Sequence, residues 1–372
     1  MKGEVELKFK IAVLPGDGIG PEVLDEGIKV LEAVGKRFGH SFELTRGLIG
    51  GVAIEAEGTA LSDDTLEMCK TRDAVLFGAV GDPRYDDPQA KIHPEDGLLA
   101  IRKGLGLFAN LRPVKLYPEL VNATPLKPEI VKGTDFIVVR ELTGGLYFGR
   151  PKRQWTTSKG RRAVDSMAYS EQEIERIVRV GFELARKRRK KLTSVDKANV
   201  LQSSRLWRQV TMEVSREYPD VQLDHMLVDT ASMRFIQSPT SFDVVVTENT
   251  FGDILTDEAS TLTGSMGMMP SASLAGIPRE GQRVMGFYEP IHGSAPKRAN
   301  QNLVNPIATI LSVAMMFRYS LALEKEAQTI EAAVAETLKE GYRTYDIMSE
   351  GCIKVGTREM GDVIASKIKK GI

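Results

Sequence analysis

The stretch that decides the fold is VVVTENTFGDILTDE, residues 244–258. Its first four residues have the pattern of a buried strand, and the residues after them fit a helix. If this helix forms, Asp253 and Asp257 are four residues apart, so both carboxylates leave one face about one turn apart. Two like charges at this spacing repel unless a cation lies between them, and Mg²⁺ and Mn²⁺ take such oxygen ligands. The alternative is a pair of solvated acids near a helix N-terminus, where the helix dipole favours them.

Strand-like runs alternate with helical patterns along the rest of the chain. This alternation predicts an α/β fold with a largely parallel sheet flanked by helices. In open α/β sheets ligands collect at the carboxyl ends of strands, where Asp253 and Asp257 open a helix. The expected strands are residues 11–14, 75–77, 136–139, 192–195, 226–228 and 244–247, and the expected helices include residues 22–34, 94–104, 174–185 and 307–316.

Length and composition narrow the class of protein. A chain of 372 residues exceeds one usual core, so two domains are expected. Fifty basic and fifty acidic residues cancel, so no overall field recruits nucleic acid or a membrane. Two distant cysteines suggest neither a disulfide framework nor a cysteine zinc site. The charged first ten residues predict no signal peptide, no apolar stretch is long enough to span a membrane, and the expected compartment is the cytoplasm.

Two glycine-rich segments predict different local structures. Residues 16–21, GDGIGP, follow an expected strand and open a helix. They are not a Rossmann fingerprint, because the third glycine of that motif would fall at Pro21. Residues 143–170 combine several glycines with many cations and short β-prone pieces, which predicts an extended hairpin or arm at a subunit interface. A disordered loop is the alternative.

Three arginines stand out as candidate ligands for carboxylates. Arg102 shares one helical face with Glu95, Leu98 and Leu99, at positions i, i+3, i+4 and i+7 of residues 94–104. This mixed face suits a pocket that binds an alkyl group next to an anion. Arg112 follows in the run NLRP, residues 110–113, and Arg140 stands at the end of an expected strand. Arginine forks bind carboxylates bidentately. Three such forks would suit a substrate with two carboxylates, although any one of them could be a surface residue.

A candidate base and a candidate proton donor stand near strand ends. Lys197 and Asp229 follow the expected strands 192–195 and 226–228. A lysine beside aspartates and a divalent ion can be held neutral and act as a base. Tyr147, in the run GLYFG, could then give or relay a proton. Each of them, taken alone, could equally be structural.

The run EPIHGSAP, residues 289–296, is rigid and rich in backbone donors. It ends near Asn305, where another helix is expected to begin. Such a loop could wrap an adenine nucleotide. His292 has no partner at a metal-binding spacing, and it could also be a structural histidine.

With these motifs the chain resembles the decarboxylating β-hydroxyacid dehydrogenases, the isocitrate/isopropylmalate dehydrogenase family. The resemblance covers nearly the whole chain, from LPGDGIGP at residues 14–21 to EMGD at 359–362, and it is most specific at residues 140–149, 249–260 and 289–296. It implies a fold that is not a Rossmann domain. Residues 1–107 plus 264–372 would form a nucleotide-binding domain. Residues 108–263 would form the substrate, metal and dimerisation domain, with an arm at about 143–170.

The resemblance also implies an activity. Such enzymes oxidise the 2-hydroxyl of a malate-type acid by hydride transfer to a nicotinamide and then lose the 3-carboxylate as CO₂. Leu98 and Leu99 imply 3-isopropylmalate as the substrate and 2-oxo-4-methylpentanoate as the product, in leucine biosynthesis. Isocitrate-specific relatives have small polar residues there, and two leucines would leave the third carboxylate of isocitrate buried and unpaired. Homoisocitrate, tartrate or malate dehydrogenases of the family are alternatives, and a nucleotide-binding regulator is a non-enzymatic one.

The resemblance assigns roles to individual residues and implies a homodimer with shared sites. Mg²⁺ or Mn²⁺ would bind Asp253, Asp257 and, from a second copy of the chain, Asp229, which also makes Asp229 part of the catalytic set. Lys197 of the second copy would be the base, and Tyr147 would protonate the enolate carbon. The substrate would contact Glu95, Leu98, Leu99, Arg102, Arg112, Arg140 and Val200. The cofactor NAD would contact Glu289, His292, Gly293, Ser294, Ala295, Pro296, Lys297, Asn305 and Asp346.

One departure from the family concerns the cofactor. NAD-dependent relatives have an acid and an aliphatic residue where this chain has Lys297 and Arg298. Two cations there would attract the 2′-phosphate of NADP. NAD is expected as the physiological cofactor, with measurable use of NADP.

Overall fold

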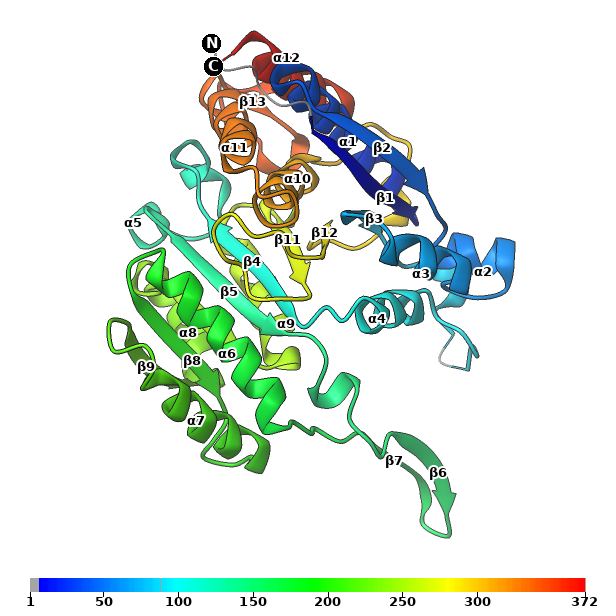
Figure 1. Cartoon of the computed structure of the whole chain (residues 1–372), viewed down its shortest axis with the longest axis vertical. Helices are drawn as coiled ribbons and strands as arrows, with labels where there is room; N and C mark the ends of the chain where they lie inside the picture. The colour runs from blue at the N-terminus through cyan, green and yellow to red at the C-terminus, as the bar shows by residue number, and fades with distance from the viewer. Residues whose placement is uncertain (1–6, 88, 372) are drawn as a thin grey trace.

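A single ten-stranded sheet runs through the computed structural model, which describes residues 7–87 and 89–371 (Figure 1). The fold class predicted from the sequence, an α/β fold with a largely parallel sheet, is confirmed. In spatial order the strands are β2 (Ser41–Arg46), β1 (Lys8–Gly16), β3 (Ala74–Ala79), β12 (Gly286–Pro290), β11 (Pro270–Leu274), β4 (Ala109–Lys115), β5 (Asp135–Glu141), β10 (Val244–Thr247), β8 (Lys191–Asp196) and β9 (Gln222–Leu227).

The sheet reverses its direction at its centre. The three pairings β12–β11, β11–β4 and β4–β5 are antiparallel, and the others are parallel. Because three reversals are an odd number, the parallel strands on the two sides run in opposite directions. Their carboxyl ends therefore point to opposite edges of the sheet.

Helices cover both faces of the sheet. Gly252 of α9 packs against the side chain of Arg140 in β5. Gly181 of α6 packs against Val246 in β10, which pairs with Val139 of β5 and points to the same face as Val139. Since neighbouring strand residues point to opposite faces, α9 and α6 lie on opposite faces. The main helices are α1 (Gly20–Phe38), α2 (Gly51–Glu57), α3 (Asp63–Lys70), α4 (Pro94–Gly104), α5 (Pro128–Val131), α6 (Glu171–Arg186), α7 (Gln202–Ser215), α8 (Val228–Gln237), α9 (Asn249–Ala259), α10 (Ile307–Tyr319), α11 (Glu324–Lys339) and α12 (Thr357–Lys370).

The expected elements are present, and two details differ. The strand expected at residues 226–228 ends at Leu227, where α8 begins, so Asp229 lies in the first turn of a helix. In α9 the N-cap is Glu248, so Asp253 and Asp257 lie one and two turns inside the helix and do not open it. Four strands of the ten-stranded sheet, β2, β4, β11 and β12, were not expected at all.

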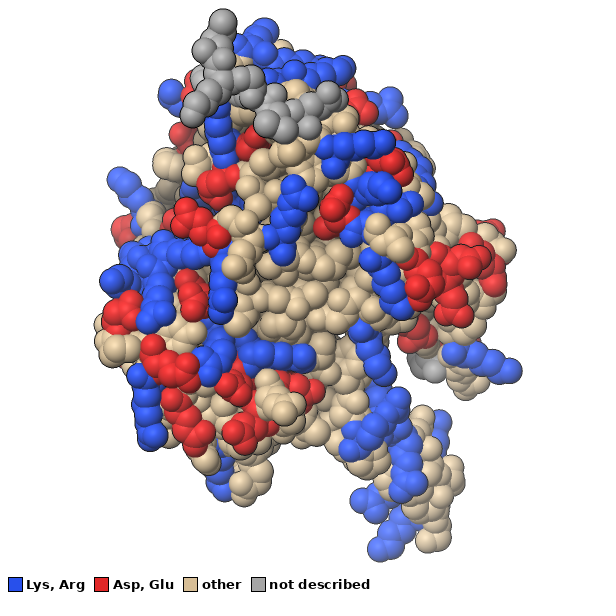
Figure 2. Space-filling model, viewed as in Figure 1, with Lys and Arg blue, Asp and Glu red and all other residues tan. Residues whose placement is uncertain are grey.

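The segment of residues 143–170 contains the predicted hairpin. Strands β6 (Arg153–Thr157) and β7 (Gly160–Val164) pair only with each other and project away from the body (Figure 1). Figure 2 shows lysines and arginines over much of this projection. A lone two-stranded hairpin is marginally stable in water, so this arm needs a surface to pack on.

The proposed division into domains stays a prediction. Strands β2, β1, β3, β12 and β11 come from residues 1–107 and 264–372, and β4, β5, β10, β8 and β9 come from residues 108–263. In the described part of the chain no helix has the length and apolar character needed to cross a membrane. The absence of a signal peptide was predicted from the first ten residues, of which residues 1–6 lie outside the described part.

Candidate active site

The site lies on one face of the sheet, where its direction reverses. Asn110 and Arg112 alternate along β4, so both point to the same face. Arg140 of β5 is paired with Asn110, and Ser271 of β11 lies on the same face. The guanidinium groups of Arg112 and Arg140 are buried, at 6% and 2% residue exposure. Buried charges need partners, and these partners define the site.

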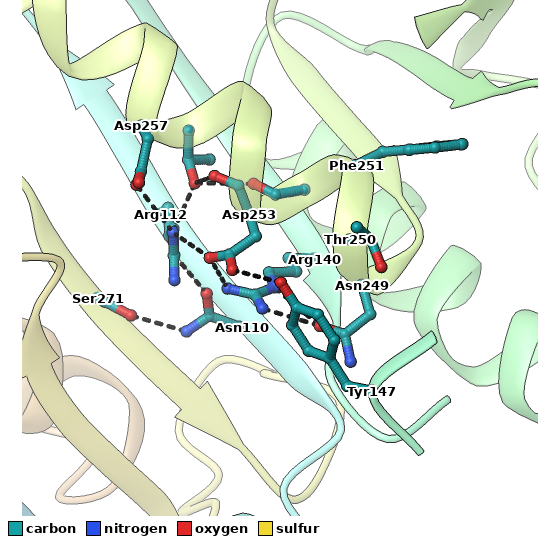
Figure 3. A network of polar contacts seen from close by, with 12 residues as sticks. Asn110, Arg112, Arg140, Tyr147, Asn249, Thr250, Phe251, Asp253, Asp257 and Ser271 are labelled. Carbon is teal, nitrogen blue, oxygen red and sulfur yellow. Dashed lines mark hydrogen bonds and ion pairs between the residues drawn. The ribbon is translucent and has the colours of Figure 1, made fainter. Parts of the chain in front are cut away.

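Asp253 is the common carboxylate partner of the two arginines (Figure 3). It accepts a hydrogen bond from Arg140 and lies 3.5 Å from Nη1 of Arg112. The hydroxyl of Tyr147 donates to its other oxygen at 2.9 Å. Asp257 lies one turn further along α9, 4.0 Å from the same Nη1 of Arg112. Both aspartates of the predicted metal pair therefore face the site.

Charge and burial shift the proton affinities of this cluster. Burial disfavours the ionised form of Asp253, but the attraction of Arg140 and Arg112 outweighs it and lowers its pKa. Burial, together with repulsion from Arg112, lowers the pKa of Arg140 to about 10. Burial and the neighbouring Asp253 raise the pKa of Tyr147, so its phenol stays protonated near neutral pH and can donate a proton.

A cavity of about 390 Å³ joins these residues to α4 and to the end of β12. Arg102 donates to Oε1 of Glu289 at 3.0 Å, and both side chains are buried. Its Nε is a buried donor without a protein partner in the described part of the chain. Leu98 and Leu99 form an apolar wall of the same cavity, with Glu95 beside them. The predicted mixed face of residues 94–104 therefore lines a pocket, as expected.

Three of the predicted catalytic and substrate-binding residues lie outside this cavity. Lys197 donates to Asp229 at 2.6 Å, and this bond lowers the pKa of the carboxyl group. Neither residue lines the cavity, and Val200, 62% exposed, does not line it either. The expectation that they serve a second copy's site stays a prediction.

The donor set suits a hard divalent cation but is incomplete in one chain. Asp253 and Asp257 supply carboxylate oxygens, which Mg²⁺ and Mn²⁺ prefer. Among the described residues no group of three or more His, Cys, Asp or Glu side chains could hold a metal ion. Two carboxylates on one helix therefore fit the cation only if another ligand, such as Asp229 of a second copy, completes the shell.

The predicted nucleotide loop follows β12 directly. His292 and Gly293 line the cavity next to Glu289, and Nε2 of His292 is buried without a partner among the residues that the structure describes. Ser294 is buried, and its carbonyl accepts from the amide of Ile19 in the glycine-rich turn. This contact joins the glycine-rich turn of residues 16–21 to the loop of residues 289–296.

The outer part of the predicted cofactor site is more exposed. Asn305 donates to Asp346 at 3.2 Å, so these two predicted residues lie together. Lys297 is exposed, and the guanidinium of Arg298 lies 4.8 Å above the ring of Tyr345. Ala295, with a φ of 36°, and Pro296 are exposed and make the turn that leads to Lys297.

Sequence reasoning missed several residues of the site. Asn110, Asn249 and Ser271 bond to its arginines or to each other, and Lys152, at the base of the arm, lines the cavity. The alternation of Asn110 and Arg112 was a usable signal for one face of a strand. No comparable signal marked Lys152.

Comparisons with known proteins agree with this architecture. A family model described as isocitrate/isopropylmalate dehydrogenase matches residues 10–364. The 3-isopropylmalate dehydrogenase of Dehalococcoides mccartyi is 67% identical over 97% of this chain and 100% of its own length. That of Carboxydothermus hydrogenoformans is 57% identical over 98% and 96%.

Solved structures give the same result. The isocitrate dehydrogenase from Methylococcus capsulatus superposes with a TM-score of 0.84 at 31% identity, covering 97% of this chain and 99% of that one. A β-decarboxylating dehydrogenase from Thermococcus kodakarensis reaches a TM-score of 0.75 at 33% identity, covering 97% and 96%. The chain belongs to the isocitrate/isopropylmalate dehydrogenase family.

Proposed function

We propose that this chain catalyses the oxidative decarboxylation of 3-isopropylmalate to 2-oxo-4-methylpentanoate and CO₂, with NAD as hydride acceptor, in leucine biosynthesis. The observation that carries the proposal is one cavity in which three buried arginines, Arg102, Arg112 and Arg140, face an apolar wall. Relatives with 67% and 57% identity that are named 3-isopropylmalate dehydrogenase support it. A cytoplasmic location is part of the same proposal.

The three arginines would bind the two carboxylates of the substrate. Nε of Arg102 is a buried donor without a partner among the described residues. The guanidinium groups of Arg112 and Arg140 are held by hydrogen bonds to neighbouring asparagines. Bidentate contacts would orient the malate skeleton. The isopropyl group would then lie against Leu98 and Leu99, where a third carboxylate would be desolvated without a partner.

Proton transfer would use Tyr147 of the same chain and the pair of Lys197 and Asp229 from a second copy. Tyr147 holds its proton and lies 2.9 Å from Asp253, which supports its role as the group that would protonate the carbon that loses CO₂. Lys197 and Asp229, already paired in each chain, would come from a second copy to act as base and metal ligand. The exposed, isolated arm of β6 and β7 supports a homodimer, because it lacks a packing surface within its own chain.

Two bound groups complete the proposed chemistry. When bound to Asp253, Asp257 and a second copy's Asp229, Mg²⁺ or Mn²⁺ supplies Lewis acidity at the substrate's hydroxyl and carboxylate. The cofactor would lie along residues 289–296 toward Lys297, Asn305 and Asp346. The exposed cations Lys297 and Arg298 support measurable use of NADP beside NAD.

A turnover screen tests the proposal. The protein is offered 3-isopropylmalate, isocitrate, homoisocitrate and tartrate, each with NAD⁺ and NADP⁺ and with Mn²⁺ or Mg²⁺. We expect the highest kcat/KM for 3-isopropylmalate. A higher value for any other substrate contradicts the assignment, and the absence of Mn²⁺-dependent turnover of all four favours a regulator.

A further inference from the structure

Two buried asparagines hold the two innermost arginines of the cavity. Oδ1 of Asn110 accepts from Nε of Arg112 at 2.7 Å. Oδ1 of Asn249 accepts from both Nε and Nη2 of Arg140, at 3.1 and 2.9 Å. The asparagines come from different elements, β4 and the start of α9, and meet their arginines at the same cavity (Figure 3).

The orientation of each side-chain amide is determined by its other contacts. Nδ2 of Asn110 donates to Oγ of Ser271 at 2.7 Å and to Oγ of Ser273 at 3.0 Å. Nδ2 of Asn249 donates to the carbonyl of Gly144 at 3.2 Å. Reversing either amide would place its NH₂ group against a guanidinium. Both asparagines are buried, at 0% and 1% exposure, so water cannot replace these bonds.

The choice of a neutral acceptor has an electrostatic consequence. A carboxylate would make a stronger, charge-assisted bond to a buried guanidinium, but it would also cancel the positive charge. An amide oxygen orients the guanidinium and adds no negative charge to that of Asp253, which already pairs with both arginines. Two guanidinium groups beside one carboxylate keep a net positive charge for an anion in the cavity. We propose that Asn110 and Asn249 are positioning residues that fix Arg112 and Arg140 for a substrate carboxylate without cancelling this remaining charge. This inference rests on the proposed function, because it requires a substrate that carries carboxylates.

Asn110→Asp is the decisive substitution. The aspartate has the same shape and still accepts from Arg112, and the hydroxyls of Ser271 and Ser273 can rotate to donate to it. Only the charge changes. At Asn249 the same substitution would place a carboxylate oxygen against the carbonyl of Gly144, so its effect would mix charge with lost anchoring.

We expect Asn110→Asp to raise the KM for 3-isopropylmalate at least tenfold, with a smaller change in kcat and an unchanged KM for the cofactor. In an Arg112→Gln background the same substitution should have little further effect on KM, because the guanidinium that Asn110 contacts is gone. A purely structural role would give the same loss in both backgrounds and would affect both KM values.

Thermal unfolding of each variant tests whether the fold survives. A folded Asn110→Asp protein whose KM lies within twofold of the parent's overturns the proposal. If that variant does not fold, Asn110→Ser decides instead. Its shorter neutral side chain cannot reach Nε of Arg112, so KM should rise at least threefold, and an unchanged KM overturns the proposal. A parent that does not turn over 3-isopropylmalate at all refutes the proposed function, which is a different outcome from either of these.

Discussion

At the scale of single residues, Leu98 is the side chain that we expect to decide which substrate fits. It lines the cavity beside Arg102 and offers only dispersion and desolvation to an alkyl group. Leu98→Ser should cost roughly 1–3 kcal/mol of discrimination in favour of an isopropyl substituent. We therefore expect kcat/KM for 3-isopropylmalate to fall far more than that for malate. Equal losses for the two acids would show that the alkyl group binds elsewhere.

Asp253 connects the arginines, Tyr147 and the proposed metal. Asp253→Asn keeps a side chain of the same shape but replaces a carboxylate ligand by a neutral amide. We expect the fold to survive and the affinity for Mn²⁺, measured by the paramagnetic signal of the free ion, to fall at least tenfold. Asp224→Asn, on the edge strand β9 where the carboxylate pairs with Lys191, is the matched control. Undiminished Mn²⁺ binding by Asp253→Asn would remove this residue from the metal site.

Lys297 tests the cofactor preference. It is exposed at the end of the nucleotide loop, where a cation would attract the 2′-phosphate of NADP. We expect Lys297→Asp to raise the ratio of kcat/KM for NAD⁺ to that for NADP⁺ roughly tenfold, since an acid repels the phosphate and accepts hydrogen bonds from ribose hydroxyls. Lys325→Asp, on the surface of α11, controls for a general change of charge. An unchanged ratio means that Lys297 does not touch the ribose.

At the scale of elements, the sequence predicted strands best where both faces are apolar. The strands β5, β8 and β10 were recognised because runs such as residues 244–247 are β-branched and buried. The strands β4 and β11 were missed because Asn110, Arg112 and Ser271 interrupt the apolar pattern, and these are the residues that face the cavity. The polar residues of the site therefore made these two strands hard to recognise from the sequence.

The contacts between elements could not be predicted from sequence spacing. Arg140 and Asn249 are 109 positions apart, and their bond depends on how α9 packs across β5. The reversal at the sheet centre likewise follows from the three antiparallel pairings β12–β11, β11–β4 and β4–β5. The residues of the site were therefore predicted from motifs and resemblance, while their mutual support was visible only in three dimensions.

The capping box of α6 allows a test of one element by itself. The hydroxyl of Ser170 accepts from the amide of Glu173 at 3.3 Å, and the Glu173 carboxylate accepts from the Ser170 amide at 2.7 Å. Ser170→Ala should destabilise the protein by about 1 kcal/mol, seen as a lower urea midpoint at unchanged slope. Ser170→Thr keeps the acceptor and should retain most of the stability. Identical midpoints for the alanine variant and the parent would show that this cap contributes nothing measurable.

At the scale of the whole molecule, the proposed site is complete only if two chains share it. Lys197 and Asp229 are paired on the surface, away from the cavity that holds Arg102, Arg112 and Arg140. A base that never reaches the substrate in its own chain must serve another copy or have no catalytic role. These alternatives predict different results when two inactive proteins are mixed.

Lys197→Ala and Arg102→Ala should each be inactive alone, because one lacks the base and the other lacks a carboxylate ligand. In a mixed dimer with shared sites, the cavity of the Lys197→Ala chain receives the intact Lys197 of the other chain, so one site is whole. Statistical exchange should then restore about a quarter of the parental activity, because half of the dimers are mixed and each has one working site. If native mass spectrometry shows mixed dimers and activity does not return, Lys197 does not act across the interface.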